Sequence, residues 1–281
     1  MKTWQADFYR RPLQDEQNRP LWELLVCDPD QTFTFGALCP QSEANSVWLK
    51  RQLEKAAANN DKGLPDQLQV FRPQSLSLLQ AACQPLGVTV QPTRNTVALK
   101  QQLLQRTQEY STLPAYTGEA YDPLGLDAPP PNPMPDGLIG DKWGFTALSA
   151  SDLTDFFTHE PIPIQTIPED LQPLIMGLPS TMPIPGVVID GGRRSMSLSL
   201  WLQETNPVSL NYISGAPDGL ILEASLVDRW VVATFEDSDV AAAAQTFEQR
   251  KQQSKGLHFL LVRPDDSGMT HTGIWLLQQE S

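Results

Sequence analysis

The sequence has little of what disulfide-bonded, zinc-bound and membrane-embedded proteins depend on. Its three cysteines, Cys27, Cys39 and Cys83, are too few and too scattered for a disulfide framework or a zinc site. No apolar run approaches the roughly 20 residues of a membrane-spanning helix. The three histidines are not spaced as a metal pair, and no serine or cysteine nucleophile motif is present. We therefore expect reduced thiols, no cofactor, no metal and no integral membrane segment.

Positive charge is also scarce, and it is unevenly distributed. The net charge is −13. Residues 1–110 carry 12 Lys and Arg against 11 Asp and Glu, whereas residues 111–281 carry 8 against 22. An acidic protein repels phosphate at long range, which disfavours sequence-independent binding of nucleic acid. Any contact with RNA must use a local basic patch, and the N-terminal half is the better place for one.

The first part of the chain predicts a mixed α/β domain. Residues 3–40 show three strand-like segments joined by short turns, which indicates an antiparallel meander. The apolar spacing then changes to that of helices, and short strands lie between them. The predicted helices cover residues 45–57, 75–86 and 96–110, and the short strands cover residues 67–71 and 88–90. This order is that of the ribonuclease H-like fold, which we predict for residues 1–112.

The rest of the chain predicts a linker and a second domain. Residues 113–186 are rich in proline and include Pro129-Pro130-Pro131, so we predict a linker with a small tryptophan-containing element. Residues 187–281 predict an α+β domain that could be a degenerate second copy of the first. Its expected helix begins at Ser238, and its expected strands cover residues 197–203, 208–214, 220–226, 230–235, 257–262 and 273–278.

A metal-dependent nuclease is the sharpest enzymatic hypothesis for such a fold. Ribonuclease H chemistry uses clustered carboxylates to hold two metal ions, and Asp7 lies on the first predicted strand. The fourth strand, however, ends at Arg72 where a carboxylate is needed, and an arginine repels Mg²⁺. We expect Asp7 and Glu23 to form ordinary pairs with Arg10 and Arg11, each worth little at an exposed site.

The strongest RNA-binding signal is an acid-free stretch. Residues 67–108 contain no Asp or Glu, but they contain Arg72, Arg94, Lys100 and Arg106. A phosphate could lie between Arg72, Arg94 and the start of the third helix, where backbone N–H groups also favour an anion. The alternative is a solvated helical face.

Two further segments are candidates for RNA contact. Gly191-Gly192-Arg193-Arg194 places two arginines on a flexible turn, where they could bind phosphate or clamp the acidic second half intramolecularly. Trp143 and Phe145 follow the proline-rich stretch and could stack on bases, although packing in the core is the alternative. With Arg11, these residues complete the predicted RNA-binding set.

Several motifs together resemble the Tab/Atab family of RNA-binding factors of cyanobacteria, algae and plants. The N-terminal half carries Trp4-x-x-Asp7-Phe8, Arg11-Pro12, Trp22-Glu23-Leu24, Phe71-Arg72 and Pro92-Thr93-Arg94. The remainder carries Leu138-x-Gly140, Trp143-x-Phe145, Arg193-Arg194, Trp201-Leu202, Gly256–Leu260 and Gly273–Leu277. The resemblance covers nearly the whole chain. It departs from the family pattern at Thr93, at Asp141-Lys142 and in the proline insert.

The resemblance implies a non-catalytic protein that binds leader or single-stranded mRNA and promotes translation of photosystem mRNAs. The alternatives are a protein–protein adaptor in photosystem assembly and a divalent-metal nuclease. Translation or assembly proteins are further expected partners. Since Met1-Lys-Thr-Trp4 leads directly into a strand-like segment, we expect no transit peptide and a cytoplasmic protein of the cyanobacterial type, with peripheral attachment to thylakoids left open.

Overall fold

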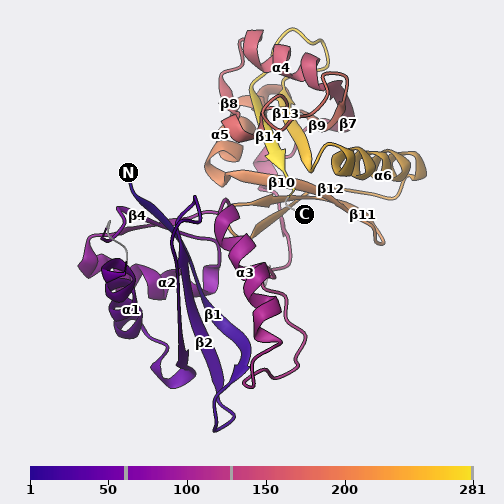
Figure 1. Cartoon of the computed structure of the whole chain (residues 1–281). Helices are drawn as coiled ribbons and strands as arrows, with labels where there is room; N and C mark the ends of the chain where they lie inside the picture. Colours follow the sequence, from indigo (N-terminus) through magenta and orange to yellow (C-terminus); the bar gives the residue numbers. More distant parts are fainter. Residues whose placement is uncertain (60–62, 127–128, 280–281) are drawn as a thin grey trace. The chain divides into compact units, whose positions relative to one another are not determined.

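A computed structural model describes residues 1–59, 63–126 and 129–279. The chain divides into two compact units, Met1–Asp127 and Ala128–Ser281. Figure 1 shows both. The fold is mixed α/β with three sheets in the described residues, as the sequence predicts.

The first unit has the predicted ribonuclease H-like strand order. Its sheet runs β3-β2-β1-β4-β5, in which β1 to β3 are antiparallel and β4 and β5 run parallel to β1. The strands are β1 (Thr3–Gln14), β2 (Pro20–Cys27), β3 (Thr34–Pro40), β4 (Gln67–Val70) and β5 (Thr89–Pro92). The helices are α1 (Ser46–Ala58), α2 (Pro73–Cys83) and α3 (Val97–Tyr110).

The two faces of this sheet bury different side chains. Helices α1 and α2 cover one face with a large apolar core that includes Trp4, Phe8 and Leu24. Helix α3 covers the other face (Figure 1). Because side chains alternate along a strand, Asp7 on β1 and Glu23 on β2 point to that second face together with Leu25. The α3 face therefore combines a small apolar core with buried charge.

The second unit contains two sheets. One runs β10-β11-β12-β6 and the other runs β7-β9-β13-β14-β8. Their strands are β6 (Asn132–Pro133), β7 (Lys142–Ser149), β8 (Ile164–Thr166), β9 (Pro183–Asp190), β10 (Pro207–Ile213), β11 (Asp218–Ala224), β12 (Asp228–Phe235), β13 (Leu257–Arg263) and β14 (Gly273–Gln278). The helices are α4 (Ala150–His159), α5 (Ser195–Thr205) and α6 (Ser238–Gln253).

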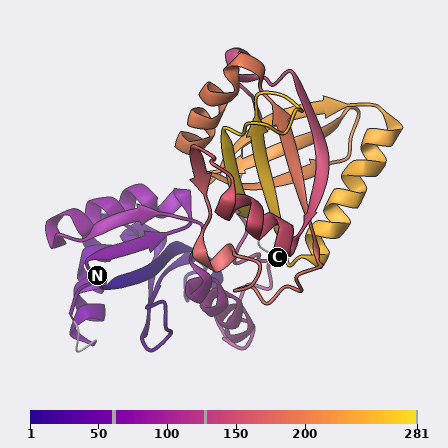
Figure 2. The ribbon, with the colours of Figure 1, turned by 90° about the horizontal axis from the view of Figure 1, so that it is seen from above.

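The main core of this unit contains residues of both sheets, of α5 and of α6. Figure 2 shows α6, in gold, beside the strands. Along β13, Leu260 and Val262 point into this core, whereas Phe259 and Leu261 pack in a second core that includes α4. Both faces of the five-stranded sheet are thus buried, which agrees with the continuous apolar run of β13.

Residues 197–203, predicted as a strand, form part of helix α5. The segment alternates serine with larger apolar residues, and this period of two favoured a strand. In the structure Ser195, Leu198, Ser199 and Leu202 are buried, at the spacing of one helical face. The prediction was wrong because two small serines belong to the buried face, while Met196 and Leu200 are 40% and 49% exposed.

The organisation around the predicted linker also differs from expectation. Residues 113–126 belong to the first unit, and β7, α4 and β8 lie within residues 113–186 yet form part of the second unit. The second unit does not copy the first at the level of topology. Its strand after α6, β13, pairs in parallel with β9 rather than with the first strand of the preceding meander, β10.

Candidate nucleic-acid interface

A buried ion network lies on the α3 face of the first unit. Arg72 lies two residues beyond the end of β4, and its Nε donates to Asp7 Oδ1 at 2.8 Å. Arg11 Nη1 lies 3.0 Å from Asp7 Oδ2, and Arg11 Nε donates to Glu23 Oε2 at 3.0 Å. Both arginines are 1% exposed, and both carboxylates are fully buried. Sequence reasoning expected exposed pairs of little value, and the burial contradicts that expectation.

Glu23 has two further donors from α3. Arg106 Nη2 and the Tyr110 hydroxyl both donate to its carboxylate. Burial alone would lower the pKa of Arg106, but Glu23 reverses the direction and the pKa is raised. Burial is the largest effect on Arg11 and lowers its pKa, but Asp7, Tyr121, Tyr110 and Glu23 together outweigh it, so the pKa of Arg11 is likewise raised. Arg11 and Arg106 therefore stay charged, and Arg72, like them, is paired with a buried carboxylate.

The chain beyond α3 returns across this network. We call residues 115–126 the strap. Arg11 Nη1 donates to the Tyr121 hydroxyl at 2.7 Å. Arg72 donates through Nη2 to the Pro123 carbonyl and through Nη1 to the Gly125 carbonyl, both at 2.8 Å. Arg72 thus has acceptors for all of its terminal nitrogens, and the predicted phosphate site between Arg72 and Arg94 is not formed in this arrangement.

Arg94 and Lys100 lie at the start of α3, outside the ion network. Both are partly exposed, and Lys100 Nζ donates to the Arg94 carbonyl at 2.7 Å. Lys100 also lies 5.6 Å from the ring centre of Phe71. Of the four cations in the acid-free stretch, the structure therefore brings Arg72 and Arg106 into the buried network and leaves Arg94 and Lys100 at the surface.

The Gly191–Arg194 turn lies at the carboxyl ends of β9 and β13. Its backbone is held by hydrogen bonds from Gly191 N to the Arg263 carbonyl, at 2.8 Å, and from Gly192 N to the Pro264 carbonyl, at 2.9 Å. Gly192 has a φ of +54°, a conformation that other residues rarely adopt. The turn leads into α5 and leaves both Arg193 and Arg194 exposed.

Three exposed cations gather at this edge, and we call Lys142, Arg193 and Arg194 the arginine edge. Arg194 Nη2 lies 3.1 Å from Asp141 Oδ1, and the Lys142 ammonium lies 3.8 Å from Asp266. The side chains of Arg194 and Lys142 are 46% and 73% exposed. Within the described residues, no carboxylate lies at ion-pairing distance from Arg193.

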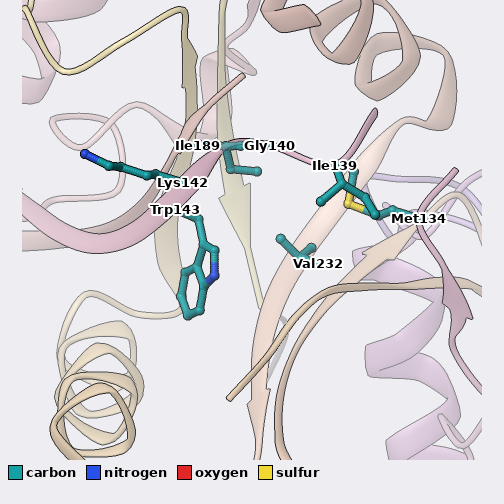
Figure 3. Close-up of a pocket in the computed structure, with 7 residues that line it drawn as sticks. All are labelled: Met134, Ile139, Gly140, Lys142, Trp143, Ile189 and Val232. Atoms are coloured by element: carbon teal, nitrogen blue, oxygen red, sulfur yellow. The ribbon is translucent and has the colours of Figure 1, made fainter. Parts of the chain in front are cut away.

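Trp143 and Phe145 pack against neighbouring aromatic rings, and each is partly exposed. The Trp143 ring centre lies 5.3 Å from that of Phe145 and 5.5 Å from that of Phe235, and Phe145 contacts Phe247 at 5.2 Å. A small cavity beside Trp143 has a volume of about 30 Å³. Figure 3 shows it, with the Lys142 ammonium pointing away from the other labelled side chains. The cavity has room for a water molecule, which is far less than a base needs.

Sequence reasoning missed two groups of exposed cations. Lys142 lies next to the predicted motif, but its role in an edge with Arg193 and Arg194 depends on the pairing of β7 with β9. Arg51 and Lys55 lie one helical turn apart on α1, and both are exposed. Their spacing of four residues was the available signal.

A second buried polar centre lies in the second unit. Lys251 Nζ donates to the Leu210 carbonyl at 2.8 Å and to Asn211 Oδ1 at 2.9 Å, and it lies 2.8 Å from Glu248 Oε1. His258 accepts from Leu210 N at 2.9 Å, so its Nε2 carries no proton. Burial lowers the pKa of His258 to about 3. Both side chains hold β10 in place, as expected for a structural histidine.

Two features define the class of protein. The first unit has a ribonuclease H-like fold whose central carboxylates are bound by arginines, and the second unit exposes a small cationic edge on an otherwise acidic domain. Together they make a candidate interface for phosphate groups. Among the described residues, no group of three or more His, Cys, Asp or Glu side chains is placed to hold a metal ion. No helix in the described ranges is both long and apolar enough to cross a bilayer.

The chain belongs to the Tab2/Atab2 family of RNA-binding proteins. Residues 3–106 match the family model described as RNA-binding protein Tab2/Atab2 N terminal. Residues 121–278 match the model of the C-terminal domain of the same proteins. The resemblance noted from the sequence motifs is thereby confirmed.

Two similar proteins come from plants. The chloroplastic Tab2 homologue of Zea mays is 29% identical over 287 residues, which cover 99% of this chain and 71% of that protein. The chloroplastic homologue of Arabidopsis thaliana is 28% identical over 283 residues, which cover 99% of this chain and 74% of that protein.

Solved structures give more distant similarities. The catalytic core domain of HTLV-2 integrase, in complex with magnesium, is 14% identical, with a TM-score of 0.28 over 40% of this chain and 75% of that chain. A chain of the simian T-cell lymphotropic virus intasome is 18% identical, with a TM-score of 0.25 over 40% of this chain and 43% of that chain.

Proposed function

We propose that this protein binds RNA without catalysing a reaction on it, and that it promotes translation of photosystem mRNAs. Membership of an RNA-binding family across both domains carries the proposal. The names of the similar plant proteins support the link to photosynthetic cells. We further propose that leader or single-stranded mRNA is the ligand and that this cyanobacterial-type member acts in the cytoplasm, with peripheral contact to thylakoids as an open alternative.

The buried network supports a non-catalytic role. In the ribonuclease H mechanism, carboxylates at these strand positions hold metal ions. Here Asp7 is occupied by two guanidinium groups, and Arg72 stands at the end of β4 where another carboxylate would be needed. A metal ion would have to displace both arginines and then lie beside their positive charges.

The energetic cost of freeing each cation favours the arginine edge as the primary RNA contact. An exposed ion pair contributes about 0.2–1 kcal/mol, so Arg194 and Lys142 can exchange their carboxylates for phosphate at little cost. Breaking a buried pair by removing one partner costs about 3–5 kcal/mol, which disfavours any use of Arg11 and Arg72 that would detach them from Asp7 and Glu23. Arg193 and Arg194 can also bind a phosphate in a bidentate manner.

The decisive experiment is RNA binding by the whole protein as a function of salt concentration. Each phosphate contact with a single strand contributes about 0.7 to the slope of log affinity against log salt. The double variant Arg193→Ala, Arg194→Ala should bind more weakly and lower that slope by about 1.4. The control Arg19→Ala, Lys255→Ala also removes two exposed cations, Arg19 in the first unit and Lys255 beside the opposite end of β13. Equal loss in both variants would show a net-charge effect and would reject the site.

A protein–protein adaptor is the second candidate, and one surface feature favours it. Met196 and Leu200 are exposed on α5, one turn apart, directly beyond the arginine edge. A protein partner could use these apolar side chains together with the exposed Glu204, one turn further along α5. Crosslinking in cell extract separates the two functions, since an adaptor should yield proteins without RNA.

A further inference from the structure

The strap lies over cationic groups whose donors match a phosphate. Arg72 presents Nη1 and Nη2 side by side, each donating to one strap carbonyl at 2.8 Å. A guanidinium binds two phosphate oxygens through the same pair of donors. Since hydrogen bonds to charged acceptors are about twice as strong as those to neutral ones, a phosphate could replace the two carbonyls.

A neighbouring donor points to the same conclusion. Within the described residues, Arg11 Nη2 is buried and has no hydrogen-bond partner. A buried charged donor without an acceptor is costly, and the Arg11 side chain is 1% exposed. Tyr9 supplies an aromatic face in the same place, because the Arg72 guanidinium lies 4.1 Å from its ring centre. The centre under the strap therefore has donor capacity that the strap does not use.

The strap is held unevenly along its length. Near its start, Gln14 N donates to the Ala115 carbonyl and Thr117 N donates to the Pro12 carbonyl. Beyond Thr117, within the described residues, the backbone N–H groups of the strap make no hydrogen bond to the sheet. Gly118 follows with a φ of +73°, and no atom lies within 4 Å of the point that a Cβ would occupy there. Gly118 is thus placed to act as a hinge.

The remaining attachments of residues 118–126 are side-chain contacts. Arg10 and Glu119 form an exposed ion pair at 2.9 Å. Tyr121 accepts from Arg11, and Leu124 and Leu126 pack, only partly buried, against the apolar core under α3. In Figure 1 the chain leaves α3 and runs back beside that helix. Few contacts must break for this half of the strap to leave the sheet.

We propose that residues 118–126 open about Gly118 and expose a second RNA site, in which Arg72 and Arg11 bind phosphodiester groups of a single strand. This inference rests on the proposed function. Asp7 and Glu23 stay in place and position the arginines, and Arg106 completes a centre of three arginines and two carboxylates. The strap then competes with RNA for the arginines. The apparent affinity of this site for RNA equals its intrinsic affinity multiplied by the fraction of molecules in which the strap is open.

The test uses the full chain and a fluorescent single-stranded RNA. Leu124→Ala, Leu126→Ala loosens the strap and leaves every charged group in place. We expect about tenfold tighter binding, which corresponds to about 1.4 kcal/mol of lost strap contact. Tyr121→Phe removes only the hydroxyl acceptor of Arg11 and should give a smaller gain without risk to folding. Leu113→Ala, at an exposed leucine before the strap, is the matched control and should not change affinity.

Two further measurements separate gating from a general loss of structure. Adding Asp7→Asn and Arg72→Gln to the loosened variant should abolish the gain in affinity. The two changes replace the ion pair by a neutral pair and remove the Arg72 guanidinium that would bind phosphate. Hydrogen exchange of the Leu124 and Gly125 amides in the wild type should become faster when RNA is added. Unchanged affinity in both strap variants, or strap amides that RNA does not affect, would overturn the proposal.

The outcomes also distinguish this proposal from the proposed function. If the wild type and the loosened variant bind no RNA, the proposed function fails. If the wild type binds RNA through the arginine edge and the loosened variant binds equally well, only the strap site fails. Inorganic phosphate, added as a competitor at the same concentration as the phosphate groups of the RNA, should displace little RNA. Complete displacement would show a site for free phosphate rather than for a phosphodiester strand.

Discussion

Replacing Arg72 by alanine should destabilise the first unit far more than replacing an exposed arginine. The change removes one of the two cations on Asp7, which is fully buried, and it leaves the Pro123 and Gly125 carbonyls without their donor. Removing one partner of a buried pair costs about 3–5 kcal/mol. The matched control is Arg19→Ala, because the Arg19 and Asp15 side chains are 50% and 20% exposed and their pair is worth about 0.2–1 kcal/mol.

The assay must resolve the two units, since a chain with two compact units need not unfold in one step. Hydrogen exchange in increasing urea, followed on peptides from β1 and β2, reports the free energy of opening of the first unit alone. Asp7→Asn combined with Arg72→Gln should cost less than Arg72→Ala, because it removes the buried charge of Asp7 together with one of its two cations. A loss of less than about 1 kcal/mol for Arg72→Ala, equal to that for Arg19→Ala, would refute the reasoning about the network.

Three other predictions concern pH, packing and thiol chemistry. The pKa of His258 is lowered from 6.5 to about 3, so the second unit should be most stable above pH 6.5. Its free energy of unfolding should fall by about 1.4 kcal/mol per pH unit as the pH falls from 6.5 toward 3. Thermal melts at a series of pH values should show this dependence, and His258→Gln should flatten it. Gly186→Ala should destabilise this unit by about 1–3 kcal/mol, because a Cβ there would lie 2.3 Å from the Phe259 ring. The control is Gly144→Ala on the adjacent strand, where a Cβ meets nothing within 4 Å, and this variant should melt like the wild type. Burial raises the pKa of the three thiols to about 12, so timed alkylation should label the native protein very slowly and the urea-unfolded protein rapidly; the cysteines are Cys27, Cys39 and Cys83.

The strand order of the first unit followed from the sequence because its signals are local. Alternation in residues 3–40, helical spacing after Asn45 and the Gly87 stop each describe a few adjacent residues. Asn45 caps α1 as expected, accepting from Trp48 N at 3.0 Å. Gly87 has a φ of +70°, in the left-handed region that glycine adopts readily and in which many helices end.

The partners of the arginines could not be read in the same way. Residues 67–108 contain no acid, so Arg72 and Arg106 looked uncompensated along the chain. Their carboxylates come from β1 and β2, 65 and 83 residues away, and only the pairing of β1 with β4 brings Asp7 beside Arg72. A charge count within a window cannot detect pairs that the sheet register creates.

Helix α5 shows the other limit of local patterns. Ser195 and Ser199 occupy buried positions because the space between α5 and its neighbouring strands is small there. Ser199 Oγ donates to Thr272 Oγ1 at 3.0 Å, and it would be only 2.9 Å from a Cβ at Gly273. The segment forms a helix, although its sequence alternates with a period of two, because α5 packs close to backbone that lies far away in the chain.

The measurement that tests the account most directly is photo-crosslinking of RNA to the intact protein, followed by mass spectrometry of the linked peptides. The account predicts linked peptides from the β9–α5 turn that contains Arg193 and Arg194, and loss of those links in the double alanine variant. Links confined to surfaces away from this turn, or the same links in wild type and variant, would contradict the claim that exposed arginines at this edge bind RNA.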